Sequence, residues 1–257
     1  MNYIDTLKPT ERFTDIAETF YQYRPHYPVQ VIDILDKFYG FKNMNSIADI
    51  GSGTGIFTKQ FMELGKIVFG VEPNDKMRKK SENDFSAFSN FKAINGTAEN
   101  TQLANNSIDL ITAAQSFHWF DTKSAISEFY RILIPEGIIL LIWNERKNSE
   151  TILMSKYEKV LRKYCVDYKE TNHNLFTFPI IKGLFKDKNI DLYMLNNHQY
   201  MDLESFIGRV RSCSYCPKPQ DRNFAPLMGS LKDIFDIHHS DNKIRFDYNT
   251  VMYIISE

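Results

Sequence analysis

The sequence lacks an excess of charge of either sign. Its 257 residues carry 31 basic and 32 acidic side chains, a formal net charge of −1 at pH 7. Proteins that bind nucleic acid or anionic lipid through their overall field carry a clear basic excess. The local basic run from Lys76 to Lys80 is flanked by acids and reads as a solvated helix face. We therefore expect a small-molecule substrate, and neither nucleic acid nor membrane as a partner.

Long apolar runs are also missing. The longest clean apolar stretch, Ile138 to Trp143, is far shorter than the roughly 20 residues of a membrane-spanning helix. The first residues, Met-Asn-Tyr-Ile-Asp, contain neither a basic n-region nor an apolar h-region, so we expect a cytoplasmic protein. No internal repeat or low-complexity linker is visible, and the length fits one elaborated domain, as a monomer or homodimer.

Cysteine is scarce, and its count of three is odd, which argues against a secreted disulfide framework. Cys213 and Cys216 form a C-x-x-C pair, but there is no second pair, and the histidines that follow, His238 and His239, are distant. Two incidental buried thiols fit this pattern better than a metal or redox site. We expect no metal.

The most informative stretch that is present runs from Ser46 to Gly55. An apolar strand, Ile47 to Ile50, is predicted to turn into a helix through Gly51, Gly53 and Gly55, whose missing Cβ atoms permit positive φ and close approach of a ligand. The spacing does not match the G-x-G-x-x-G of dinucleotide-binding proteins. The carboxylate of Asp49 would repel a pyrophosphate and attract an ammonium or sulfonium group. The turn therefore disfavours NAD and favours a cationic ligand.

A second acid ends the next apolar strand, Lys66 to Glu72, 17 residues after Gly55. That offset is near the roughly 20 residues at which related folds place a ribose-binding acid. The acid-x-G-x-G-x-G pattern from Asp49 to Gly55, with Glu72, resembles the class I S-adenosylmethionine-dependent methyltransferases. The resemblance implies S-adenosyl-L-methionine as the cofactor, with its ribose on Glu72.

The resemblance covers roughly residues 10 to 145. Asn95–Glu99 is similar to the family's adenine loop, and Ile108–Asp121 to its fourth strand and active-site loop. Thr97 replaces the usual acid, and Glu136 replaces the first glycine of the usual pair before the fifth strand. The implied cofactor-binding residues are Asp49, Gly51, Ser52, Gly53, Gly55, Glu72, Pro73, Thr97, Ala98, Glu99, Gln115, Tyr21 and Arg24.

Two further segments resemble the trans-aconitate-methyltransferase-like subgroup. In that subgroup a Tyr-Arg-Pro segment similar to residues 21–28 of this chain covers the cofactor, which implies that Tyr21 and Arg24 face the bound ligands. The alternative is that these residues form a proline-stiffened linker whose aromatic side chains pack on the domain. The subgroup also has an Arg-Ser-x-Ser-Tyr segment near its acceptor site, and residues 211–215 of this chain are similar to it. The alternative is that these residues form a surface turn. The substrate-binding residues implied are Trp119, Arg211, Ser212 and Tyr215.

His118, in Gln-Ser-Phe-His-Trp-Phe, is the candidate catalytic residue, because its ordinary pKa lies near neutrality. It would act as a base for a hydroxyl or amine acceptor, or only position a carboxylate. The alternative is a histidine packed between Phe117 and Trp119 to hold the loop.

Strands that alternate with helices predict an α/β fold: a Rossmann-like, mostly parallel seven-stranded sheet with helices on both faces, an antiparallel C-terminal edge strand and a helical cap. The predicted helices are 11–23, 29–39, 55–64, 75–85, 122–133, 149–165, 202–212 and 227–237, and the predicted strands are 46–50, 66–72, 91–95, 108–113, 137–143, 190–195 and 244–255. We expect residues 1–257 to form a single methyltransferase domain. Its core would comprise about 29–144, 190–197 and 243–257, and its cap 1–28, 145–189 and 198–242.

The sequence thus predicts an S-adenosylmethionine-dependent methyltransferase that acts on a small polar or anionic metabolite with an O-, N- or carboxylate acceptor. A methyltransferase-like protein that binds the cofactor as a regulator or scaffold, without turnover, stays open because fold does not fix function. A nicotinamide-dependent oxidoreductase is disfavoured by Asp49 and the glycine spacing.

Overall fold

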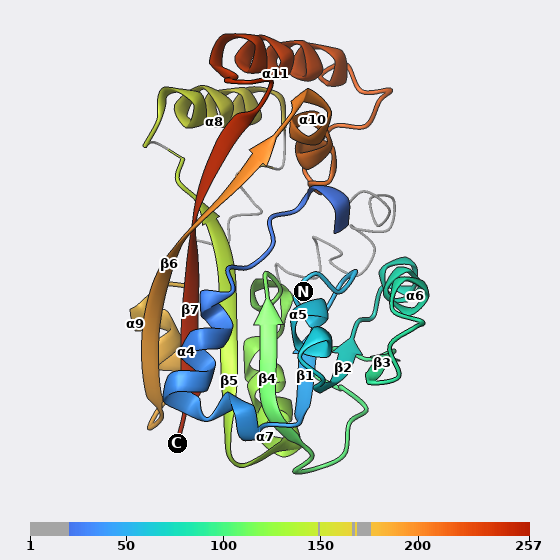
Figure 1. Cartoon of the computed structure of the whole chain (residues 1–257), viewed down its shortest axis with the longest axis vertical. Coiled ribbons are helices and arrows are strands. Elements are labelled where there is room, and N and C mark those ends of the chain that lie inside the picture. Colours follow the sequence, from blue (N-terminus) through green and yellow to red (C-terminus); the bar gives the residue numbers. More distant parts are fainter. Residues whose placement is uncertain (1–20, 149, 166–167, 169–175) are drawn as a thin grey trace.

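The computed structural model describes residues 21–148, 150–165, 168 and 176–257. Within them lies a seven-stranded sheet of order β3-β2-β1-β4-β5-β7-β6, in which β7 alone runs antiparallel (Figure 1). The strands are β1 Ser46–Ile50, β2 Ile67–Val71, β3 Phe91–Ile94, β4 Ile108–Ala114, β5 Leu133–Arg146, β6 Asn189–Met201 and β7 Ile244–Ser256. The predicted class, a mostly parallel Rossmann-like sheet with helices on both faces, is confirmed.

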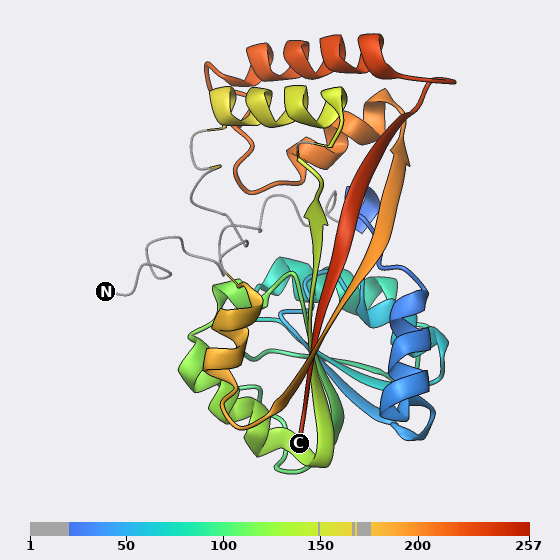
Figure 2. The same ribbon diagram turned by 90° about the vertical axis from the view of Figure 1, so that its left-hand side faces the viewer.

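Two apolar layers cover the two faces of this sheet. Successive β1 residues alternate between them, because neighbouring side chains in a strand point to opposite faces: Ile47 packs with α4 and α5, and Ala48 packs with α7 and α9. Figure 2 shows α7 and α9 on one side of the sheet and α4 on the other. The helices are α4 Gln30–Tyr39, α5 Thr58–Glu63, α6 Asp75–Asp84, α7 Thr122–Ile132, α8 Ile152–Tyr164, α9 Phe178–Leu184, α10 Leu203–Arg211 and α11 Phe224–His238, with 3₁₀ turns η2 Phe41–Asn43 and η3 Phe117–Trp119.

The place of the C-terminal strand needs a correction. The sequence pattern predicted an edge strand there, whereas β7 lies between β5 and β6, and β6 forms the edge. From Val251 to Ile255 every β7 residue is buried, because both faces of the strand are covered, while β6 is half-buried or exposed along most of its length. A continuous apolar run is typical of an interior strand. The pairing partners come from distant parts of the chain.

Three strands extend beyond the rest of the sheet. β5 and β6 are longer than predicted, and with β7 they reach α8, α10 and α11, which gather at one end of the molecule (Figure 1). A third apolar cluster there joins Tyr157 of α8, Phe206 of α10, Leu231 of α11 and Phe246 of β7. This end of the molecule is called the helical end below.

Local sequence signals predicted most helix and strand boundaries correctly. Gly40 ends α4 in the left-handed conformation at φ 68°, and Asp202 caps α10 by accepting a hydrogen bond from the Ser205 backbone N–H. The helix predicted over residues 11–23 lies largely outside the described residues, which show only 21–23 as helical. Helix α9 was not predicted.

Candidate functional site

The turn after β1 holds its three glycines in the left-handed region, with φ of 67° at Gly51, 58° at Gly53 and 85° at Gly55. A Cβ on Gly55 would lie 2.2 Å from the ring of Phe85, so packing requires that glycine. A Cβ on Gly53 would meet nothing closer than the Met77 sulfur, at 3.6 Å. Gly53 therefore leaves its space to the cavity, as the spacing argument expected for a residue that a ligand approaches.

A cavity of about 390 Å³ lies at the carboxyl ends of β1, β2 and β4. Such an edge is where open α/β sheets bind their ligands. Of the residues predicted to bind a cofactor, Gly55 and Tyr21 do not line it. Those that line it are Arg24, Asp49, Gly51, Ser52, Gly53, Glu72, Pro73, Thr97, Ala98, Glu99 and Gln115.

Glu72 is held rigidly at the cavity wall. Its side chain is buried, its Oε2 accepts from the Gly53 backbone N–H at 2.9 Å, and its Oε1 accepts from the Asn74 N–H at 2.8 Å. Burial raises the pKa of this carboxyl, although the two backbone donors oppose the rise. A carboxylate offers about four lone-pair positions, so these two bonds leave capacity for a pair of vicinal hydroxyl groups.

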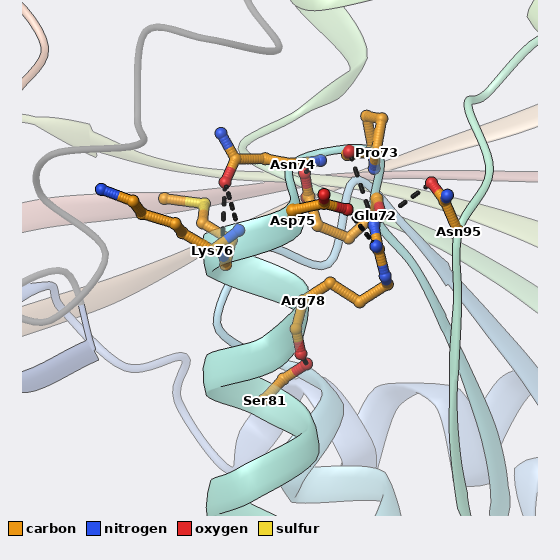
Figure 3. A network of polar contacts seen from close by, with 9 residues as sticks. Glu72, Pro73, Asn74, Asp75, Lys76, Arg78, Ser81 and Asn95 are labelled. Atoms are coloured by element: carbon orange, nitrogen blue, oxygen red, sulfur yellow. Dashed lines mark hydrogen bonds and ion pairs between the residues drawn. The ribbon is translucent and has the colours of Figure 1, made fainter.

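Arg78 braces the loop that carries Glu72 (Figure 3). Its Nη1 donates to the backbone oxygens of Glu72 at 2.9 Å and Pro73 at 3.4 Å and to Asn95 Oδ1 at 3.2 Å, and Nη2 pairs with Asp75. Arg78 is buried, so the interpretation of residues 76–80 as one solvated basic face is wrong for this residue. A guanidinium with several donors in one plane suits this bracing role.

Asp49 presents a buried negative charge. Only 1% of the residue is exposed, its Oδ2 accepts from Thr58 Oγ1 at 2.6 Å, and its Oδ1 accepts from Thr112 Oγ1 at 2.8 Å. Burial raises the pKa of Asp49 to about 6, although both hydroxyls oppose the rise. At neutral pH the group is thus ionised but poorly solvated, and a cation in the cavity would be attracted to it.

Gln115 and Asn144 join the site to three other segments. Gln115 lines the cavity with a left-handed φ of 57°, and its Nε2 donates to the Asn144 backbone oxygen at 3.1 Å. The buried Asn144 side chain donates to the carbonyls of Pro25 and His26, each at 3.4 Å, and accepts from Thr250 Oγ1 at 2.5 Å. The sequence analysis missed Asn144, although a polar residue directly after the apolar run of β5, at the ligand-binding edge of the sheet, was a usable signal.

On the side toward the helical end the cavity is lined by arginines. Arg24 and Arg209 line it, and Arg24 Nη2 donates to the Ser212 carbonyl at 2.7 Å. Arg211, which was predicted to bind substrate, is exposed and does not line the cavity. The helical period was the missed signal: residues three and four apart share a face, which places Arg209 beside the buried Phe206.

The other predicted substrate and catalytic residues differ in whether they line the cavity. Trp119 lines the cavity, whereas Ser212, Tyr215 and His118 do not. The ring of His118 lies 4.9 Å from that of Trp119, and its Nδ1 accepts from Trp143 Nε1 at 3.4 Å. This geometry matches the packing alternative, in which the histidine holds the loop.

Cys213 contacts an arginine, and no cysteine belongs to a metal-binding cluster within the described residues. The sulfur of Cys213 accepts from Arg209 Nη1 at 3.0 Å. Burial by itself raises the pKa of this thiol, but the positive charges of Arg24 and Arg209, a hydrogen bond with Tyr215 and the positive charge of Arg146 bring it down to about 7. The lowered pKa of Cys213 therefore indicates a positive electrostatic potential around this thiol.

Comparison with known proteins agrees with this geometry. Residues 48–141 match the family model of a methyltransferase domain. The chain is 35% identical over 141 residues to an uncharacterized methyltransferase of Schizosaccharomyces pombe, and the matched segment covers 53% of each protein. The chain thus spans about half the length of the curated relatives that it matches.

Solved structures share the fold at low identity. A putative type II methyltransferase from Anaeromyxobacter dehalogenans has a TM-score of 0.64 at 18% identity, covering 90% of this chain and 96% of that one. A phosphoethanolamine N-methyltransferase of Haemonchus contortus, solved with S-adenosyl-L-methionine, has a TM-score of 0.59 at 18% identity, covering 100% of this chain and 60% of that one. Both show the fold alone.

No helix among the described residues is both long and apolar enough to cross a bilayer. The cytoplasmic location stays a prediction.

Proposed function

We propose that this protein transfers the methyl group of S-adenosyl-L-methionine to a small polar or anionic metabolite. The observation that carries the proposal is the division of charge around one cavity. Its Gly-turn side presents Glu72 and Asp49, and its opposite lining presents Arg24 and Arg209. The match of residues 48–141 to methyltransferase domains and the cofactor named for the Haemonchus contortus neighbour support the same assignment.

The lining fits this cofactor on chemical grounds. Glu72 has capacity left to accept from both hydroxyls of a ribose, and the ionised Asp49 favours the positive amino-acid and sulfonium end. Gly53, whose N–H holds Glu72, leaves room for a ligand against the backbone. When bound, the cofactor supplies an electrophilic methyl group whose transfer removes a positive charge.

The chain's own residues would position the acceptor and exclude water. Trp119, Phe120 and Tyr27 provide aromatic walls around the cavity, and a dry site favours a reaction that destroys charge. Near-attack alignment is the main requirement of such a displacement. His118 would act through Trp119, as a positioning residue, because its Nδ1 is engaged with Trp143 and it does not line the cavity.

A labelling experiment tests the proposal against a regulatory protein without turnover. The purified chain would be incubated with methyl-tritiated S-adenosylmethionine and a fractionated metabolite pool, with Glu72→Gln as the matched variant. We expect tritium in a small-molecule product, and at least about ten-fold lower cofactor affinity in the variant, because a hydrogen bond to a charged group contributes on the order of 1.5 to 3 kcal/mol. Tight NAD binding, or label only in RNA or protein, would contradict the proposal.

A further inference from the structure

Three arginines converge in the helical end behind the cavity. Arg24 comes from the segment before α4, Arg146 from the end of β5 and Arg209 from α10. Arg24 Nη2 donates to the Ser212 carbonyl at 2.7 Å and Arg209 Nη1 donates to the adjacent Cys213 at 3.0 Å, while the Arg146 guanidinium lies 5.2 Å from the centre of the Tyr157 ring. Arg24 and Arg209 also line the cavity. We call this group, with the buried Tyr157, the arginine cluster.

Arg209 and Arg146 hold more positive charge than the described carboxylates around them balance. Arg209 is only 6% exposed, its Nη1 donates to Cys213, and it forms no ion pair with any described carboxylate. Among the described residues Arg146 has one acidic neighbour, Glu158 at 3.9 Å, and that carboxylate is shared with Arg162 at 2.8 Å. Buried charges in proteins are normally paired, because an isolated one loses its hydration.

Several buried donors in the cluster also lack a hydrogen-bond partner within the part of the chain that the structure describes. They are Arg209 Nε, Arg146 Nη1 and the hydroxyl of Tyr157, a residue with no exposed surface. Buried polar atoms are satisfied in the great majority of cases, so three orphaned donors in one cluster, one of them on Arg209 in the cavity lining, indicate a missing acceptor. Two of the three belong to guanidinium groups, whose fork geometry matches carboxylate or phosphate oxygens.

We propose that the arginine cluster is the acceptor subsite and that it selects a small acceptor with at least two negative charges on carboxylate or phosphate groups. This inference rests on the proposed function and narrows it, because it excludes neutral alcohols and amines. The cationic donor and the polyanionic acceptor would be sorted by the acidic and basic sides of the same cavity. Tyr157 adds a neutral donor beside the guanidinium groups.

Thermal unfolding of the purified chain tests the subsite without turnover. Succinate and maleate serve as dicarboxylates, glycerol 3-phosphate as a phosphate dianion, and succinamide as the neutral analogue, each titrated in the presence of S-adenosylhomocysteine. We expect at least one dianion to raise the melting temperature in a concentration-dependent way, as any ligand specific for the folded state does, and succinamide to have no effect. The phosphate and dicarboxylate arms identify the anionic group.

The variant Arg209→Met separates a binding role from a structural one, with the exposed Arg222→Met as the matched control. A buried charge that no described carboxylate balances carries a desolvation cost, and an apolar side chain of similar length removes that cost. We therefore expect Arg209→Met to melt at a higher temperature than wild type without anion, and to lose at least about ten-fold in dianion affinity. Arg222→Met should resemble wild type in both.

Three outcomes would overturn the inference: no dianion shifts the melting temperature, succinamide acts as strongly as succinate, or Arg209→Met keeps wild-type anion affinity. Arg146→Met provides a second test if Arg209→Met fails to fold. Cofactor binding is measured separately by calorimetry. Absent cofactor binding would refute the proposed function, whereas intact binding with a neutral acceptor would refute the anionic subsite alone.

Discussion

Replacing Asp49 by asparagine should stabilise the ligand-free protein and weaken its binding of the cationic cofactor. The carboxylate is 1% exposed, and its pKa is raised from an ordinary 3.8 to about 6, mainly by burial. At about 1.4 kcal/mol per pKa unit, that difference corresponds to a cost on the order of 3 kcal/mol for keeping the group ionised in the folded state.

The pH dependence has a definite sign. Because the folded pKa lies above the unfolded one, the unfolded chain loses its proton first, and stability falls as the pH rises from about 3.8 to about 6 and then levels off. Asp49→Asn should therefore gain most at pH 7.5, and the gain should shrink as the pH is lowered toward 5. The hydroxyl of Thr58 or Thr112 must turn to accept from the new amide, so we expect about 1 to 3 kcal/mol.

Two measurements check this reasoning. Urea unfolding of the ligand-free protein at both pH values gives the stability difference, and calorimetry compares S-adenosylmethionine with the neutral fragment 5′-methylthioadenosine. We expect a loss of about ten-fold or more for the cation and little change for the neutral fragment, since only the former carries the charge that Asp49 attracts. A variant that is less stable at pH 7.5, or that loses both ligands equally, would refute the argument.

Three further predictions concern the turn, the arginines and Asn144. Gly55→Ala should destabilise the fold by about 1 to 3 kcal/mol, since its Cβ would collide with an aromatic ring, whereas Gly53→Ala should stay folded and lose cofactor affinity. Urea unfolding measures the first effect and calorimetry the second. A destabilised Gly53→Ala together with a stable Gly55→Ala that loses cofactor affinity would contradict this assignment. Arg209→Ala should lower kcat/KM for the acceptor about ten-fold and Arg211→Ala should not, and the reverse order in steady-state kinetics would restore the assignment made from sequence. Asn144→Asp should turn a donor into an oxygen that faces two carbonyls, so acceptor KM should rise and stability fall by about 1 to 3 kcal/mol; unchanged kinetics would exclude its positioning role.

The parts of the fold that the sequence predicted well depend on local chemistry. The strand before Gly51, the acid that ends β2 and the Asp202 cap each follow from a few adjacent residues, and the structure has them where the patterns put them. The cavity lining follows as well, because the carboxyl ends of parallel strands share one edge of the sheet.

The parts that were missed depend on contacts between distant segments. Whether Arg209 or Arg211 faces the cavity is decided by how α10 docks, and periodicity would have favoured Arg209 had the burial of Phe206 been recognised. One hydrogen-bond partner of His118 is Trp143, 25 residues away, and no local pattern relates an imidazole to that indole. Pairing order in a sheet is likewise a global property, which explains the misplaced edge at β7.

The interior position of β7 has a consequence for how the protein is made. Ile244–Ser256 follows both of its neighbours in the chain, so during synthesis β5 and β6 exist before the strand that must lie between them. Until β7 inserts, the apolar Ile138–Trp143 segment of β5 has an unpaired edge open to other chains. The nascent chain would thus be most exposed to aggregation just before β7 leaves the ribosome, a stage at which a chaperone would be most effective.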